Sequence, residues 1–133
     1  MIRILIGAVL LTTAAGANAQ SIQSLNKTNM TNKEKAAAVN QAVQKGDAAI
    51  IGDFVREDYK QHTPPVPDGR KGLIGLINKI ANKEIPAPVI TTVRAFEDGD
   101  FVVLHHDVRW PNRKVMIEVF RFKDGAAAEH WSA

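Results

Sequence analysis

A single carboxylate in the middle of an apolar segment is the first candidate for chemistry in this sequence. Residues 114–122 read KVMIEVFRF, a pattern that predicts a β-strand rich in apolar side chains. Alternate side chains of a strand share a face, so Glu118 shares its face with Met116, Phe120 and Phe122. Burial among apolar groups disfavours the charged carboxylate and raises its pKa, so we expect Glu118 to have a specific role.

Histidine side chains are the natural partners for such a carboxylate. His62 precedes the third predicted helix, and His130 lies in the last predicted strand. His105 and His106 are adjacent in another strand, where neighbours face opposite sides, so only one of them can line a pocket, and we favour His105. An imidazole beside a buried carboxylate suits proton transfer, since each group can tune the proton affinity of the other.

Structural interpretations of the same residues stay open. A histidine in a strand is more often a satisfied structural group than a catalyst. Glu118 can equally form a structural salt bridge across the sheet, with Arg94, Arg109 or Arg113 as its partner. The histidines lack the H-x-x-x-H or H-E-x-x-H spacing of a helical metal site, and the sequence contains no glycine-rich phosphate loop. We therefore predict neither a metal nor an organic cofactor.

The composition excludes several classes of protein and site. With 133 residues, 45% of them hydrophobic, the chain is long enough for one folded domain and no more. Its 17 basic and 14 acidic residues are interspersed without a basic stripe, so we predict no nucleic-acid partner. The absence of cysteine excludes disulfides, a thiol nucleophile and a cysteine-ligated metal.

The first residues have the pattern of a signal peptide. Arg3 precedes an apolar run at 4–11, and an A-x-A cleavage signature ends at Ala19. The run is well short of the roughly 20 residues that span a bilayer, which argues against a membrane anchor. We predict a signal peptide at 1–19, a flexible lead-in at 20–30, and a periplasmic or secreted protein with no membrane association after cleavage.

The elements that must position these side chains change character along the chain. A capping box from Thr31 to Glu34 begins the first predicted helix, and helices are expected at 33–45, 48–55 and 70–82. Apolar or alternating segments separated by turn residues then predict strands at 89–97, 101–110, 113–123 and 127–133. This order is typical of an α+β fold. We expect residues 31–133 to form a single domain, with N-terminal helices packed on a curved antiparallel sheet around a central pocket.

Three blocks of sequence resemble one known family. They are DYKQHTPPVPDGRKGLIGLI, VVLHHD and IEVFRFKDGAAAEHW, in this order along the chain. They are similar to the SnoaL-like polyketide cyclases, in particular to a small bacterial branch of predicted aldol-condensation enzymes. That family shares its α+β cone with ketosteroid isomerase and nuclear transport factor 2. The resemblance covers roughly residues 33–131.

The resemblance implies roles for individual residues. Family members carry an acid/base aspartate on the penultimate strand, and Glu118 stands in its place within EVFR. His62 matches the histidine of a Y-x-Q-H segment, and His105 lies in a strand that often offers a further polar group. The implied catalytic residues are therefore Glu118, His62 and His105. The implied substrate contacts are Tyr59, Met116, Phe120, His130 and Trp131, with Trp131 closing the pocket.

Two functional hypotheses follow. In the first, the protein is a cofactor-independent general acid/base catalyst that acts beside a carbonyl group of a small apolar molecule, by aldol-type condensation, cyclisation or isomerisation. Glu118 would take the proton, and His62 and His105 would orient the substrate. In the second, the same fold is a non-catalytic module for small-ligand binding or dimerisation. A homodimer is expected in either case.

Overall fold

A computed structural model of the chain describes residue 27 and residues 29–133. The predicted signal peptide and nearly all of the predicted lead-in lie outside these residues. Thr31–Ala133 forms one compact unit, which contains all the elements described below. Within the described part of the chain, the helices are all too short or too polar to cross a membrane.

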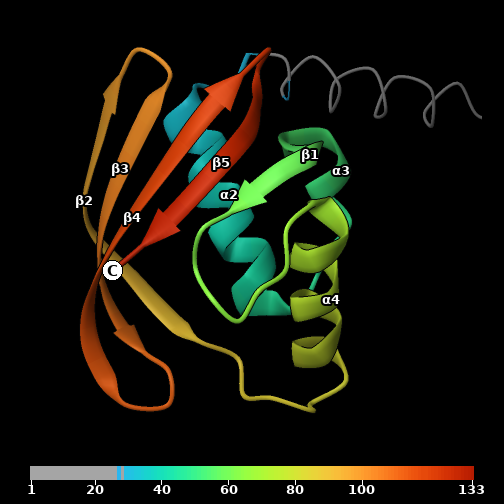
Figure 1. Cartoon of the computed structure of the whole chain (residues 1–133). Helices are drawn as coiled ribbons and strands as arrows, with labels where there is room; N and C mark the ends of the chain where they lie inside the picture. The colour runs from blue at the N-terminus through green and yellow to red at the C-terminus, as the bar shows by residue number, and fades with distance from the viewer. Residues whose placement is uncertain (1–26, 28) are drawn as a thin grey trace, which may run out of the picture. The chain divides into compact units, whose positions relative to one another are not determined.

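Three helices of the described residues precede or interrupt the strands. They are labelled α2, α3 and α4 in Figure 1. Helix α2 spans Asn32–Lys45, and the predicted capping box is confirmed: the backbone N–H of Glu34 donates to Thr31 Oγ1 at 3.2 Å, and the N–H of Thr31 donates to Glu34 Oε2 at 2.7 Å. It ends at Gly46, whose φ of 65° favours glycine. Helix α3 is only Ile51–Phe54, shorter than the predicted 48–55: residues 48–50 form a turn before it, and Val55 already begins a strand. Helix α4 spans Arg70–Ala81.

The strands form one five-stranded sheet. Strands β2 (Val89–Asp98), β3 (Phe101–Arg109), β4 (Arg113–Lys123) and β5 (Ala126–Ser132) make the predicted antiparallel meander. A further strand, β1 (Val55–Gln61), pairs in parallel with β5, so the sheet is mixed and its order is β1-β5-β4-β3-β2. The sequence did not predict β1, because only two of its seven residues are buried and its pattern is mostly polar.

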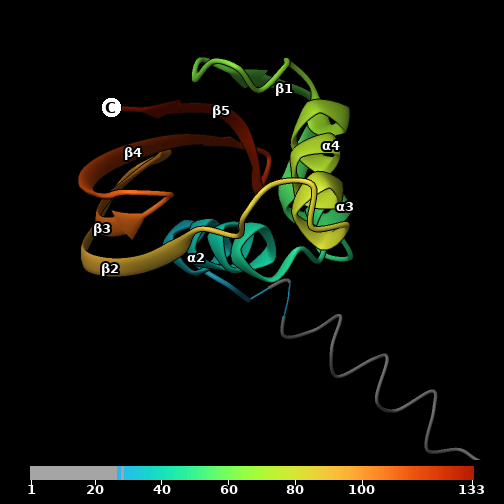
Figure 2. The ribbon, with the colours of Figure 1, turned by 90° about the horizontal axis from the view of Figure 1, so that it is seen from below.

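The meander curves around the helices, and Figure 2 shows strands β2 to β5 bending around α2 while α3 and α4 lie beside them. The inner face of the sheet and the helices share one apolar core, which includes Val39, Leu73, Ile77, Val102, Leu104 and Phe122. Helices packed on one side of a curved sheet are the expected α+β cone.

The outer face of the sheet differs from the inner face. Alternation and register place residues 102, 104, 106 and 108 of β3 on the inner face and residues 101, 103, 105 and 107 on the outer face. The exposed large apolar side chains of the described residues all belong to β2, β3 and β4: Val89, Val93, Phe96, Phe101, Val115 and Ile117. The outer face therefore exposes large apolar side chains, with charged side chains among them.

Candidate functional site

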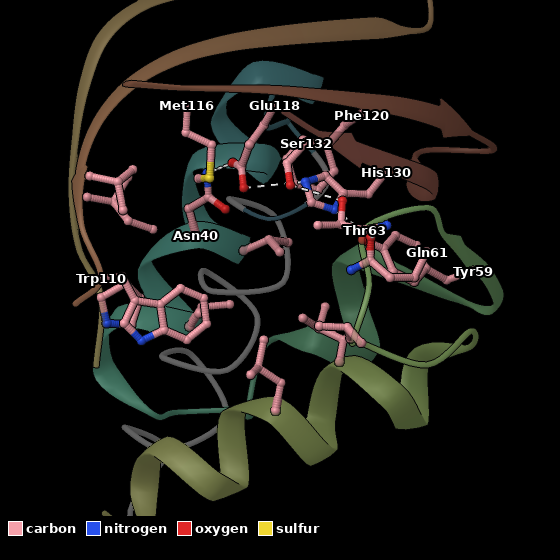
Figure 3. A pocket seen from close by; sticks show the side chains of 18 residues that line it. Asn40, Tyr59, Gln61, Thr63, Trp110, Met116, Glu118, Phe120, His130 and Ser132 are labelled. Atoms are coloured by element: carbon pink, nitrogen blue, oxygen red, sulfur yellow. Dashed lines mark hydrogen bonds and ion pairs between the residues drawn. The ribbon is translucent and has the colours of Figure 1, made fainter. Parts of the chain in front are cut away.

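A cavity lies between the concave side of the sheet and the helices (Figure 3). About 90 Å³ of it is open to the centres of water molecules, several times the roughly 10–15 Å³ that one water needs. Most of its wall is apolar and includes Val39, Val43, Leu73, Leu76, Val108 and Trp110. Polar side chains gather at the opposite end from Trp110, where Glu118 and His130 face one another.

Glu118 projects from the middle of β4 into this polar end and is 6% exposed. Its Oε2 accepts a hydrogen bond from Asn40 Nδ2 at 2.6 Å and lies 3.1 Å from His106 Nε2. Its Oε1 lies 3.3 Å from His130 Nε2. Each carboxylate oxygen therefore has its own nitrogen partners. No arginine among the described residues pairs with Glu118, so the alternative of an arginine salt bridge is wrong.

The pKa of Glu118 results from opposing effects. Burial raises it, while the contacts with His106, His130 and Asn40 lower it, and the net result is a pKa of about 2. The expectation of a raised pKa is therefore wrong: the apolar neighbours along β4 were correctly placed, but three polar side chains from other elements outweigh them. Glu118 is an ionised carboxylate at neutral pH.

His106, and not His105, is the histidine of β3 that reaches the site. His106 is fully buried and contacts Glu118, whereas His105 lies on the outer face, opposite Ile117, beside a shallow groove that Asp107 also lines. The choice of His105 is wrong because His105 shares its face with charged Asp107. The sequence carried this signal: Val102, Leu104 and Val108 alternate in phase with His106.

His62 and Trp131 also lie away from the cavity, on the outer side of the sheet. The His62 ring stacks on Trp131 with centroids 4.7 Å apart, and its Nε2 is 3.2 Å from Glu129 Oε2. In β5, His130 pairs with Phe120 on the inner face, so Trp131 next to it faces outward. The predicted pocket positions of His62 and Trp131 are therefore wrong. Trp110 lines the cavity instead and donates through Nε1 to the Pro86 carbonyl at 2.7 Å.

Four other predicted contacts line the cavity: Tyr59, Met116, Phe120 and His130. Burial raises the pKa of the Tyr59 hydroxyl, and the charge of Glu118 raises it further, so this group stays protonated. His130 Nδ1 lies 2.8 Å from Gln61 Oε1, and its ring packs against Phe120 with centroids 4.5 Å apart. The ring of His130 is thus held between a polar and an aromatic neighbour.

Several polar residues of the site were not predicted from the sequence. Asn40 is buried in α2 and contacts both Glu118 and His106. The sequence indicated Asn40 by an amide on the apolar stripe of a helix, one turn after Ala36 and one turn before Val43. Gln61, Thr63 and Ser132 also line the cavity, and the hydroxyls of Ser132 and Thr63 are 2.9 Å apart. No local pattern marks these three residues. They meet only because the end of β1, a strand that was not predicted, pairs with β5.

The two imidazoles do not converge as metal ligands. His106 and His130 approach different oxygens of Glu118, and no group of three histidine, aspartate or glutamate side chains in the described part of the chain is arranged to hold a metal ion. What the site offers is a carboxylate base, an imidazole able to donate a proton, and amide and hydroxyl groups able to orient a ligand.

The SnoaL-like domain family matches residues 36–130, most of the unit that contains the site. The chain belongs to the SnoaL-like domain family. A comparison with functionally curated proteins gave no match in sequence. The site described above is therefore the site of a SnoaL-like domain, with a glutamate as its central acid.

Solved structures show the same SnoaL-like fold at low sequence identity. A cystatin-fold protein of unknown role from Novosphingobium aromaticivorans is 18% identical with a TM-score of 0.67, over 79% of this chain and 99% of its own. IdmH from Streptomyces antibioticus, described as a candidate polyketide cyclase, is 18% identical with a TM-score of 0.62, over 78% and 91%. An NTF2-like protein of unknown function from Cytophaga hutchinsonii is 11% identical with a TM-score of 0.66, over 79% and 90%.

Proposed function

We propose that this SnoaL-like protein is a general acid/base catalyst that acts, through its own side chains, beside a carbonyl group of a small apolar molecule. The single observation that carries the proposal is an ionised carboxylate, buried at the polar end of an apolar cavity and flanked by an imidazole. Perturbed titratable groups that meet in a cavity are typical of catalytic sites. Similarity in fold to IdmH, described as a candidate polyketide cyclase, supports the same class of reaction.

The arrangement of Glu118 and His130 suits a concerted enolisation. His130 Nε2 donates its proton to the substrate carbonyl oxygen, and Glu118 takes a proton from the adjacent carbon, so an enol forms. Once His130 has given up its proton, its positive charge no longer lowers the pKa of Glu118, and the carboxylate becomes a stronger base as it acts.

The enol has two outcomes in such a cavity. In an aldol closure, its carbon attacks a second carbonyl, the enol proton returns to His130, and Glu118 gives its proton to the new alkoxide. In an isomerisation, Glu118 returns the proton to a different carbon and His130 recovers its own. The apolar wall formed by Val43, Leu76 and Trp110 favours a substrate with a hydrocarbon body and excludes water from the enol.

Hydrogen–deuterium exchange tests the proposal without knowledge of the natural substrate. Small cyclic ketones and 1,3-diketones in D₂O, observed by proton NMR, serve as probes of proton abstraction. The unaltered protein is expected to accelerate exchange beside the carbonyl, and Glu118→Gln to abolish the acceleration. Glu129→Gln is the matched control, because Glu129 lies on the neighbouring strand but faces outward. Acceleration that persists in Glu118→Gln would rule out the catalytic role.

A non-catalytic ligand-binding function is the second candidate, and one observation favours it: a resting pKa of about 2 makes Glu118 a weak base. In that case the probes bind to the cavity but their exchange is not accelerated. Calorimetric titration of the same ketones separates the two functions. Binding by both the unaltered protein and Glu118→Gln, without exchange in either, identifies a binding module.

We also propose that a second copy of the chain covers the outer face of the sheet. The six exposed apolar side chains of the described residues gather there, and arginines and acids such as Arg113, Arg121, Asp107 and Glu129 are interspersed among the outer strands. A two-fold arrangement can set each sign of charge against the other. Light scattering should give twice the monomer mass, and Phe96→Asp should give the monomer. A monomeric unaltered protein would contradict the dimer.

Export through the signal at residues 1–19 remains part of the proposal. Expression of the full chain in a bacterium with a periplasm should give mature protein that begins at Gln20 in the periplasmic fraction, as measured by intact-protein mass spectrometry. Full-length protein retained in the cytoplasm would contradict the export.

A further inference from the structure

We infer that Gln61 is a positioning residue, which keeps a proton on Nδ1 of the His130 ring. A second proton is then shared between His130 Nε2 and Glu118 Oε1 at the cavity wall, and this proton can be transferred. The inference rests on the proposed acid/base function and deepens it, because it assigns the origin of the proton that the imidazole donates. It depends on three contacts: between Gln61 and Thr63, between Gln61 and His130, and between His130 and Glu118.

Strand pairing brings Gln61 to His130. The parallel pairing of β1 with β5 sets Gln61 opposite His130, and the N–H of the next residue, His62, donates to the His130 carbonyl at 2.9 Å. Both side chains line the cavity, and Figure 3 shows the Gln61 amide beside the His130 ring. A side chain anchored by its backbone in this way can hold a ring in one orientation.

The backbone of Thr63 fixes which amide atom of Gln61 faces His130. The N–H of Thr63, always a donor, points at Gln61 Oε1 at 3.4 Å. The same Oε1 lies 2.8 Å from His130 Nδ1. An amide oxygen accepts and cannot donate, so Nδ1 of His130 must carry the proton of this hydrogen bond.

The second ring nitrogen then requires a proton of its own. Nε2 of His130 is 3.3 Å from Glu118 Oε1 and has no hydrogen-bond partner in the described part of the chain. If His130 were protonated on Nδ1 alone, the lone pair of Nε2 would face an ionised carboxylate oxygen, which is repulsive. A proton between Nε2 and Oε1 removes the repulsion. The pair thus holds one more proton than a neutral imidazole beside a carboxylate.

The other carboxylate oxygen limits where this proton can move. Asn40 and His106 both occupy Oε2, so Oε1 is the oxygen left to His130 and to a ligand. Within the site, the proton is therefore confined to one nitrogen and one oxygen. Without Gln61, a neutral His130 could carry its one ring proton on Nε2 and donate it to Glu118. The pair would then lack the additional proton that it can transfer.

Nitrogen-15 NMR of the histidine rings at pH 7 tests the inference without any substrate. In the unaltered protein, Nδ1 of His130 is expected to be protonated; in Gln61→Met, which has a similar shape but no acceptor oxygen, that proton is expected to be lost. Gln61→Glu keeps an acceptor and should restore it. Thr63→Val is the matched control, since it removes only the Thr63 hydroxyl and should leave Nδ1 protonated.

The outcomes separate this inference from the proposed function. An unprotonated Nδ1 in the unaltered protein, or a protonated Nδ1 in Gln61→Met, would overturn the inference even if ketone exchange is accelerated. If Gln61→Met does not fold, the unaltered protein and Gln61→Glu still decide, because both must carry the Nδ1 proton. Absence of ketone exchange in the unaltered protein, with the expected NMR result, would overturn only the catalytic function.

Discussion

The sheet carries two clusters of glutamate and histidine, one on each face. On the inner face, Glu118 contacts His106 and His130 at the end of the cavity. On the outer face, Glu129 contacts His62 and forms a salt bridge with Arg121. The two carboxylates lie on neighbouring antiparallel strands, and each contacts histidine. Residue type alone therefore does not distinguish their surroundings.

The difference lies in what neutralises each carboxylate. The hydrogen bond from Arg121 is the first cause of the lowered pKa of Glu129, and His62 adds to it. A guanidinium keeps its charge throughout the physiological range, so the outer cluster has no need of a shared proton. The inner cluster has only imidazoles and an amide. Its charge balance therefore depends on protons that can move, which is what acid/base chemistry requires.

The adjacent histidines provide the sharpest test of this comparison. His106→Ala removes a fully buried partner of Glu118 and leaves a space, so we expect the free energy of unfolding to fall by about 4 kcal/mol. His105→Ala, one residue away on the outer face, should change it by less than about 0.5 kcal/mol. Urea denaturation measures both. Equal effects would mean that the two faces of β3 are not distinguished as described.

Acid should affect the inner cluster through Glu118. Its pKa is lowered from the ordinary 4.5 to about 2, so its contribution to stability is fully present above pH 4.5 and is lost as the pH falls towards 2. The shift corresponds to about 3 kcal/mol. Urea denaturation between pH 7 and pH 3 should show a steeper loss of stability for the unaltered protein than for Glu118→Gln. Parallel profiles would contradict the lowered pKa.

Asn40 should have a smaller effect than His106. Asn40→Ala removes one donor to the buried carboxylate, and we expect a loss of about 2 kcal/mol in the free energy of unfolding. Gln41→Ala, at the next and exposed position of α2, is the matched control and should change stability little. If both variants behave alike in thermal denaturation, the hydrogen bond from Asn40 does not support Glu118.

Added salt should have the smallest effect on stability. It should act on the exposed outer cluster around Glu129 and not on the buried inner cluster around Glu118. Ions screen charges at the surface much more than buried ones. Raising NaCl from 0.05 M to 1 M should reduce the change in melting temperature caused by Glu129→Gln, while the change caused by Glu118→Gln should stay the same. A salt-dependent effect of Glu118→Gln would place that carboxylate in contact with solvent.

Local patterns predicted most of the fold. Helix α2 has its capping box and glycine stop, and β2 to β5 have alternation and turn residues, so these elements could be identified from neighbouring residues alone. Strand β1 could not, because an edge strand with few buried residues lacks alternation. Its parallel pairing with β5 depends on contacts between residues some seventy positions apart.

The site was predicted less completely for the same reason. Alternation grouped Glu118 with apolar side chains on one face of β4, and the resemblance to SnoaL-like cyclases implied that it points into the cavity. Its ionisation depends on Asn40, His106 and His130 from three other elements. The choice of His105 over His106 needed the phase of β3, which its charged neighbours on one face already indicated. Gln61 came within reach only through the strand that the sequence did not predict.

The most direct test of the account is the ionisation of Glu118 in the folded protein. Carbon-13 NMR of the glutamate side-chain carboxyls, with Glu118→Gln used for assignment, follows each group from pH 7 to pH 3. We expect the Glu118 resonance to stay that of a carboxylate throughout, in keeping with a pKa of about 2. A titration midpoint at or above the ordinary 4.5 would contradict the ionised, imidazole-paired carboxylate on which the proposed chemistry depends.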